Sequence, residues 1–417
     1  MILILTHSDF RLLWIAFTLT GLAWIMFMMV QGWLTLSLTG SPLWVGTITG
    51  IGGVGWMSSS IVGGVLADRY SRRKLVLTSN LILAGATAAI APSILSESIL
   101  LWQIATLSLI AGATSGMRMP AFMSMTLDVV GRERLLSANG AIYLGFGVGG
   151  MIAPLIAGTI ASHWHIGIVY VCISTVSLVA PLILFKLPQQ RDMPEFDSDL
   201  IKLPDHEDLW NAAKFAVGYA RKAPIVRSLI LLSFVSEVFG WSHNSMLPVI
   251  AKDVLGTKLS GLGYLQSAGM AGSILSTSVI SNLKDIRHKE RLMLVTAILF
   301  PMFLIIFSGT RTFPMALVTL AAAYAMGSAF DATLWTVLHS TIPNSLRGRI
   351  SSFVAFTWGV NGLSGFHTGA LANRFGAPWA IVIGAVTMIT YTLRILPLAT
   401  DISKASKRCG KHKPPIQ

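Results

Sequence analysis

The sequence is short of charge. Asp, Glu, Lys and Arg together make up 12% of its 417 residues, whereas 53% are hydrophobic. A soluble domain is roughly a quarter charged, because charged side chains keep its surface hydrated. A chain with so few charges cannot cover a surface of this size in water. We therefore expect lipid to be the solvent for most of it.

Residue patterns for enzyme chemistry are also missing. There are two cysteines, Cys172 and Cys409, and no group of His, Cys and acids has metal-ligand spacing. The sequence contains no G-x-x-x-x-G-K-[ST] phosphate loop, no G-x-S-x-G turn and no H-E-x-x-H helix. We expect neither an enzyme nor a protein that needs a metal or a cofactor.

Long apolar runs dominate what is present. A bilayer requires about 20 apolar residues per helix. Charged or turn-rich breaks separate twelve such runs, at residues 11–37, 44–67, 75–95, 98–126, 138–161, 166–187, 227–250, 259–282, 291–309, 313–341, 350–372 and 377–399. The expected fold is an all-α membrane protein with twelve transmembrane helices.

The basic residues lie in the breaks between these runs. Of 31 Lys and Arg residues, 26 fall on the side that holds both termini and 4 on the other, and Arg118 falls within a run. Such an excess marks the cytoplasmic side, so both termini are predicted to be cytoplasmic. The net charge of +13 thus indicates the membrane surface as partner, and not nucleic acid.

The two halves of the chain look related. Arg11 opens the first run and Arg227 opens the seventh, and the similar stretches 74–77 and 291–294 are separated by nearly the same offset. A shared offset predicts two pseudo-symmetric six-helix bundles, a parallel repeat known from transporters. The predicted parts are an N-terminal bundle, a linker, a C-terminal bundle and a basic cytoplasmic tail, at residues 1–187, 188–226, 227–400 and 401–417.

The linker is the one long polar stretch. Its residues 205–222 begin with acids and end with Arg221 and Lys222, an order that suits a helix dipole. An apolar stripe along one side favours an amphipathic helix on the cytoplasmic membrane surface. A plain solvated linker helix is the alternative.

The stretch "GGVLADRYSRRK" (63–74) places an acid and four bases between two apolar runs. It resembles the signature loop of the major facilitator superfamily, a small-residue run followed by D-R-x-G-R-[RK], with Ser71 at the usual glycine. The residues that match and enter our prediction are Gly64, Asp68, Arg69, Arg72 and Arg73.

This resemblance implies a cytoplasmic latch between the two bundles. The small residues would let the second helix approach a helix of the other half. Asp68 would lie at the N-terminal end of helix 350–372, where the helix dipole favours an anion. Arg72 would reach Asp128. The alternative is that the bases only determine topology.

A second motif lies in the fifth run. "GGMIAPLIAG" (149–158) resembles the antiporter motif G-x-x-x-G-P-x-x-G-G, in which Gly149, Pro154 and Gly158 match, while Ala153 and Ala157 replace glycines. The resemblance implies an exporter. An ordinary kinked helix with small residues is the alternative.

Three further stretches, 118–122, 135–140 and 212–230, resemble bacterial exporters of the enterobactin and macrolide type. This resemblance implies a bacterial inner-membrane protein that carries a siderophore or drug. Many proton-coupled members have an arginine in the fourth helix where this chain has Ser108. Coupling would therefore need another residue.

Ionisable residues inside membrane helices are costly, so each is a candidate site. Glu237 lies near the middle of the seventh run, with Trp241 and His243 following it. Apolar surroundings favour the neutral form of a carboxyl, which suits reversible protonation. Glu237 is our candidate coupling group or cation ligand, and a structural hydrogen bond is the alternative.

Arg118 and Asp331 hold nearly equivalent positions in the two halves. They could pair across a central cavity, or each could serve its own half. Trp24 and Trp241 are deep enough to line a cavity for an amphipathic substrate, or to pack in the core.

These observations predict a monomeric secondary transporter that works by alternating access. We expect it to export an amphipathic small molecule in exchange for protons. An importer of the same fold is the first alternative. A transporter-like membrane sensor is the second, although the polar stretches are short for a soluble output domain.

Overall fold

The computed structural model of the protein describes residues 4, 6–187, 218, 223–282, 288–342 and 347–398. The predicted linker helix, apart from residue 218, and the predicted basic tail lie outside the described residues. For some helical residues, among them Gly64, Asp68 and Arg69, only the backbone is described.

The chain divides into two compact units. Unit 1 comprises Met1–Leu203 and Leu247–Ser267, and unit 2 comprises Pro204–Met246 and Ala268–Gln417. A short stretch from the second half of the sequence thus groups with the first half. The bundle boundaries expected from the sequence stay a prediction.

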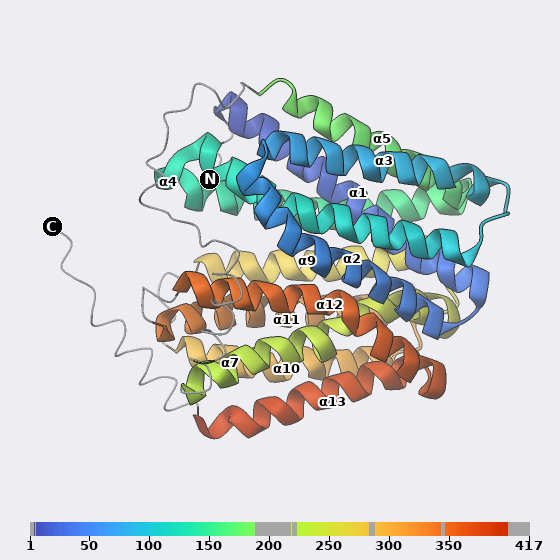
Figure 1. Ribbon diagram of the computed structural model, residues 1–417. Coiled ribbons are helices and arrows are strands. Elements are labelled where there is room, and N and C mark those ends of the chain that lie inside the picture. The colour runs from blue at the N-terminus through green and yellow to red at the C-terminus, as the bar shows by residue number, and fades with distance from the viewer. Residues whose placement is uncertain are drawn as a thin grey trace. The chain divides into compact units, whose positions relative to one another are not determined.

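Long helices make up most of the part of unit 1 that the structure describes. They are α1 (Ser8–Thr39), α2 (Pro42–Arg69), α3 (Arg72–Leu95), α4 (Leu101–His163) and α5 (Ile166–Leu184). Helix α3 packs against α5, and α1 packs against both α4 and α5 (Figure 1). Helix α4 contains two of the predicted membrane runs and bends at Gly131, whose φ of 70° is one that glycine adopts without strain.

Helices α2 and α4 meet through their backbones. A Cβ atom at Gly112 would collide with the carbonyl oxygen of Gly52, and one at Gly63 would lie 2.6 Å from the Cα atom of Met117. Small residues allow such close approach within a bilayer. Gly63 belongs to the run that was expected to face the other half. Gly63 packs on α4 of its own unit, and the approach of this run to the other half stays a prediction.

Unit 2 begins with α7 (Pro224–Val235) and contains α10 (Lys289–Gly309), α11 (Phe313–Thr341), α12 (Arg347–Phe375) and α13 (Ala377–Ile395). Helix α13 packs against α10 and α7 (Figure 1). Helix α9 (Leu259–Asn282) starts in unit 1 and ends in unit 2.

The seventh run, expected as one helix over 227–250, is interrupted. After α7 come a π-helical turn at Ser236–Gly240 and a 3₁₀ segment at Trp241–Met246. The short α8 (Leu247–Val249) and a second π-helical turn (Ile250–Val254) follow. Such breaks mark functional positions in many membrane helices.

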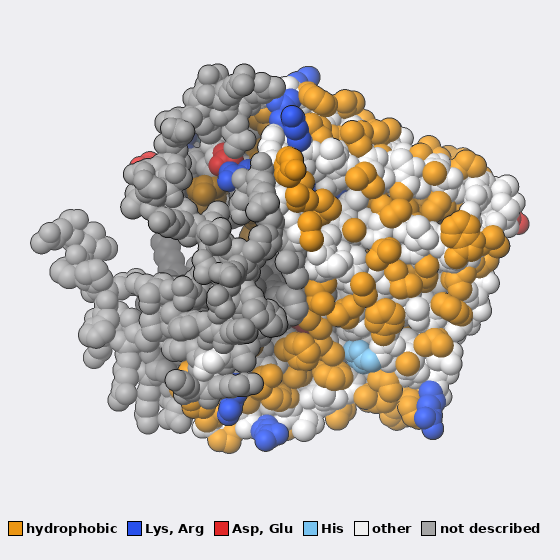
Figure 2. Space-filling view, in the orientation of Figure 1, with side chains coloured by type: hydrophobic (Ala, Val, Ile, Leu, Met, Phe, Trp, Pro, Cys, Tyr) orange, Lys and Arg blue, Asp and Glu red, His pale blue; other side chains and the backbone are white. Residues whose placement is uncertain are grey.

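Each of the twelve apolar runs overlaps helical structure, and eight helices in the described part are long and apolar enough to cross a membrane. Hydrophobic and uncharged side chains cover most of the described surface visible in Figure 2, whereas Lys and Arg occur at only a few places there. The prediction of an all-α membrane protein is confirmed.

Candidate functional site

The break after α7 holds a buried acid. Glu237 lies in the π-helical turn and is 7% exposed. The side-chain amide of Asn361, from α12, donates to the Glu237 carboxyl Oε2 at 3.0 Å and approaches the Glu237 backbone oxygen at 3.3 Å. A π turn interrupts the regular α-helical hydrogen bonds. Here the Asn361 amide contacts both the backbone and the carboxyl of Glu237.

A second acid reaches the same place from α11. Tyr324, Gly327 and Asp331 are spaced three and four residues apart and therefore share one face of that helix. The Tyr324 ring lies edge-on to Trp241 at 5.3 Å between centroids, and a Cβ at Gly327 would lie 2.8 Å from the same indole. This face of α11 is therefore directed at the break in the seventh run.

Asp331 completes the cluster. The Trp241 side chain lies within hydrogen-bonding reach of the Asp331 carboxyl. Asp331 is also close enough to Glu237 for the two acids to interact electrostatically. Nothing in the linear sequence indicates that α11 and the seventh run bring these two acids together.

Aromatic rings enclose this cluster. Trp241 lies 4.9 Å from Phe300 and 5.9 Å from the His243 ring, measured between centroids. The His243 Nδ1 atom is 2.8 Å from the carbonyl oxygen of Gly240, while its buried Nε2 has no partner among the described atoms. The rings of Phe300 and His243 thus pack against that of Trp241.

The arrangement of the acids suits the exchange of a proton. Ionising both Glu237 and Asp331 would place two like charges together in apolar surroundings, which is costly. No ion pair with either acid occurs among the described residues. The described residues also contain no group of three or more His, Cys, Asp or Glu side chains that could hold a metal.

Unit 1 buries a base instead. Arg118 is 6% exposed, and its guanidinium donates to Ser115 Oγ at 3.0 Å and to Asn80 Oδ1 at 3.5 Å. The Thr20 hydroxyl also donates to Asn80 Oδ1, at 3.4 Å. Arg118 and Asp331 thus each have partners within their own unit, in line with the second alternative from the sequence.

The signature loop forms an ion pair. Arg72 donates from one guanidinium nitrogen to both carboxylate oxygens of Asp128, at 2.6 and 2.5 Å. Arg73 donates to the backbone oxygen of Leu187 at 2.9 Å and so ties the start of α3 to the residues after α5. The pairing of Arg72 with Asp128 is the one expected from the sequence. Its role in a latch, and every contact of Asp68, stay predictions.

The stretch 149–158, called the proline motif below because it contains Pro154, lies in the last part of α4. It packs tightly against the start of α9, within unit 1. A Cβ at Gly263 would lie 2.5 Å from the carbonyl oxygen of Pro154, and one at Gly158 would lie 3.0 Å from the chain of α9. The Ser267 hydroxyl donates to the Met151 carbonyl oxygen at 2.7 Å. Proline has no N–H, so Pro154 leaves the carbonyl oxygen of Gly150 without its regular helical donor, next to the residue that accepts from Ser267.

Two predicted site residues make looser contacts. A Cβ at Gly149 would meet only side chains at ordinary distances, the nearest being Leu22 at 3.6 Å. Trp24 is half-buried on α1, with its ring 6.1 Å from that of Phe27.

The apolar helices and their enclosed polar clusters define a multi-pass helical membrane protein. A family model described as Major Facilitator Superfamily matches residues 13–366. The chain belongs to the major facilitator superfamily, a family of transporters and not of enzymes.

Curated relatives and solved structures agree with this assignment. The chain is 24% identical to the enterobactin exporter EntS of Citrobacter koseri, over 92% of this chain and 85% of the relative. Among solved structures, a bacterial homologue of the human lysosomal transporter Spinster, inward-facing and unoccupied, matches with a TM-score of 0.70 at 16% identity, covering 98% of this chain and 99% of that one. A mutant of the nucleoside transporter NupG matches with a TM-score of 0.72 at 11% identity, covering 94% and 100%. The structural matches support the fold, and the transported substrate is a small molecule in keeping with the family.

Proposed function

We propose that this transporter exports an amphipathic small molecule, a siderophore or a drug, in exchange for protons. In this proposal it works by alternating access in the bacterial inner membrane, as a monomer with both termini in the cytoplasm. The observation that carries the proposal is the buried acid Glu237 at the break in the seventh run, with Asp331 near it.

The acid pair would carry the coupling proton. Glu237 takes up a proton from outside, the halves rock, and the substrate binds from the cytoplasm as the proton leaves inward. The Asn361 amide stabilises the ionised form of Glu237, because it already donates to that carboxyl. Asp331 favours reprotonation, since a neighbouring negative charge disfavours a second one.

Neighbouring helices make close contacts with the turn that bears Glu237. Gly240 leaves room for the Phe300 ring, because a Cβ at Gly240 would lie 2.8 Å from it. Gly384 of α13 leaves room for the Phe239 carbonyl oxygen, because a Cβ at Gly384 would lie 2.5 Å from that oxygen. The wide turn is therefore held by side-chain packing on neighbouring helices. A change of protonation at Glu237 would alter the contact with Asn361 at the point where the helix is already irregular.

The direction of transport rests on the likeness to exporters and on the proline motif of α4. In the proposed cycle the Arg72–Asp128 pair closes the cytoplasmic side and opens when substrate enters. Import is the second candidate. It is favoured by Ala153 and Ala157, which replace two glycines of the exporter motif. A sensor function gains no support from a match to a transporter family.

The test is gradient-driven transport by the Glu237→Gln variant. Inverted membrane vesicles energised to pump protons inward would be supplied with enterobactin or a macrolide. Wild-type vesicles should accumulate the substrate, and E237Q should lose accumulation by about tenfold or more, because proton and substrate binding are coupled through this residue.

Glu97→Gln provides the matched control. It makes the same chemical change at an exposed acid and should leave accumulation unchanged. Full accumulation by E237Q at normal expression would contradict the proposed role. Uptake into right-side-out vesicles by the wild type would instead favour the importer.

A further inference from the structure

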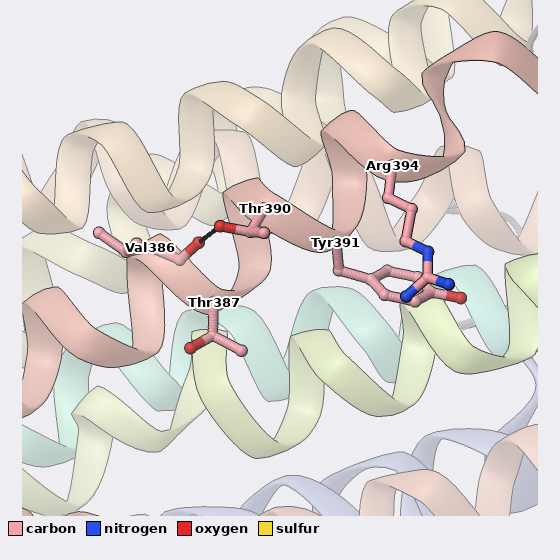
Figure 3. Close-up of a pocket in the computed structure, with 5 residues that line it drawn as sticks. All are labelled: Val386, Thr387, Thr390, Tyr391 and Arg394. Carbon is pink, nitrogen blue, oxygen red and sulfur yellow. Dashed lines mark hydrogen bonds between the residues drawn. The ribbon is translucent and has the colours of Figure 1, made fainter.

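A pocket opens beside α13. It has a volume of about 320 Å³ and is lined by Val386, Thr387, Thr390, Tyr391 and Arg394. In Figure 3 the Tyr391 and Arg394 side chains lie next to each other and extend over the neighbouring ribbon. The Tyr391 hydroxyl donates to the backbone oxygen of Ser228 at 3.3 Å, which places the pocket where the last turns of α13 meet the first turn of α7.

The mouth of this pocket is basic. Arg394 lies in the last turn of α13 and Arg227 in the first turn of α7, and both are exposed. Arg227 and Arg394 are both close enough to Tyr391 to act on it electrostatically. Among the described residues, neither guanidinium forms an ion pair with a carboxylate. Arg394 lines the pocket, and Arg227 precedes Ser228, whose backbone oxygen accepts from Tyr391.

The hydroxyl groups of the two threonines already donate to backbone oxygens, so they are not available to bind an anion. The Thr387 hydroxyl donates to the backbone oxygen of Ile383, and the Thr390 hydroxyl donates to that of Val386, both at 2.8 Å. The donors free to bind an anion at the mouth are therefore the guanidinium groups, which bind phosphate oxygens in a fork.

Below the mouth the surface is apolar. Val386 is 48% exposed, and it precedes Arg394 by two helical turns, which is about 12 Å along the axis. On α7, Leu231 and Phe234 are 43% and 40% exposed. A charged end and an apolar strip of this length match a phosphate group with an attached acyl chain.

We propose that this pocket binds an anionic phospholipid. The phosphate lies between Arg227 and Arg394, and an acyl chain follows the apolar strip past Val386. Basic pockets between membrane helices recognise acidic headgroups in this way. A zwitterionic headgroup fits less well, because its ammonium group would approach two arginines.

The test uses the purified full-length protein and counts retained lipids by native mass spectrometry. The protein would be taken from mixed vesicles of phosphatidylglycerol and phosphatidylcholine of matched chain length. The wild type should retain phosphatidylglycerol selectively. The double variant R227Q/R394Q should retain about tenfold less or lower still.

R311Q/R374Q is the matched control. It removes the same charge from two other exposed arginines and should keep wild-type selectivity. A second variant, R227K/R394K, keeps the charge and should retain part of the binding even if the neutral variant folds poorly. Thermal unfolding in detergent would report on folding in each case.

Three results would overturn the proposal. One is equal retention of both lipids by the wild type. Another is unchanged selectivity in R227Q/R394Q. The third is displacement of the retained lipid by millimolar inorganic phosphate, since a site for free phosphate would not need the acyl chain.

Discussion

The two units bury opposite charges. Unit 1 encloses Arg118 among the neutral groups of Asn80 and Ser115, whereas unit 2 buries Glu237 and places the half-buried Asp331 near it. An arginine keeps its proton at any pH a protein meets, but a carboxyl can release and regain one. If protons drive this transporter, the buried group able to carry them among the described residues is therefore to be sought in unit 2.

The backbones of the two units differ as well, in the regularity of their helices. In unit 1, α2 and the part of α4 before its bend at Gly131 meet through a seam of glycines. In unit 2, the helix that bears Glu237 is broken at the acid itself. A close backbone seam resists rearrangement, while an irregular turn has fewer regular hydrogen bonds to lose. Unit 1 is expected to move as a body, and the changes around the proton to be local to unit 2.

The largest effect is expected for Asp331→Asn. The amide keeps the size of the side chain and can still accept from Trp241, but it cannot release a proton. Gradient-driven accumulation in energised vesicles should fall by about tenfold or more, while exchange of substrate without a gradient should persist. Loss of both activities would show that Asp331 acts in substrate binding or folding instead.

Arg118→Gln should have a smaller effect. Glutamine can still donate to Asn80 and Ser115, so the free energy of unfolding should change by about 1 kcal/mol. Thermal unfolding in detergent measures this change, and the same vesicles report accumulation. The comparison between units fails if R118Q abolishes proton-driven accumulation as fully as D331N does.

The smallest change in stability is expected at Arg72 and Asp128. Their side chains are 27% and 21% exposed, so the ion pair should contribute about 1 kcal/mol or less. If the pair closes the cytoplasmic side, D128N should still slow transport although it unfolds normally. The exchanged pair R72D/D128R should recover part of the rate. Equal transport rates in the wild type, D128N and R72D/D128R would contradict the role of this ion pair as a latch.

Much of the fold could be predicted from the sequence, because membrane helices are long, apolar and flanked by asymmetric charge. The partner of Arg72 could also be predicted, since the family resemblance points to Asp128. The pairing of Glu237 with Asp331 could not, because it depends on how α11 faces the seventh run. The break in that run depends on packing as well: Gly240 and Gly384 admit Phe300 and the Phe239 carbonyl, and neither glycine is by itself a signal for a wide turn.

The π-helical turn at 236–240 also makes the site sensitive to the number of residues in the chain at this point. A π turn closes its hydrogen bond over five residues where an α turn uses four, so it holds one residue more. If the same residues instead closed as a regular α-helix, everything on one side of the turn would rotate by about 100°. The register of Glu237 relative to His243 and Asn244 is thus set by a single extra residue. A length change, and not only a substitution, can redirect this site.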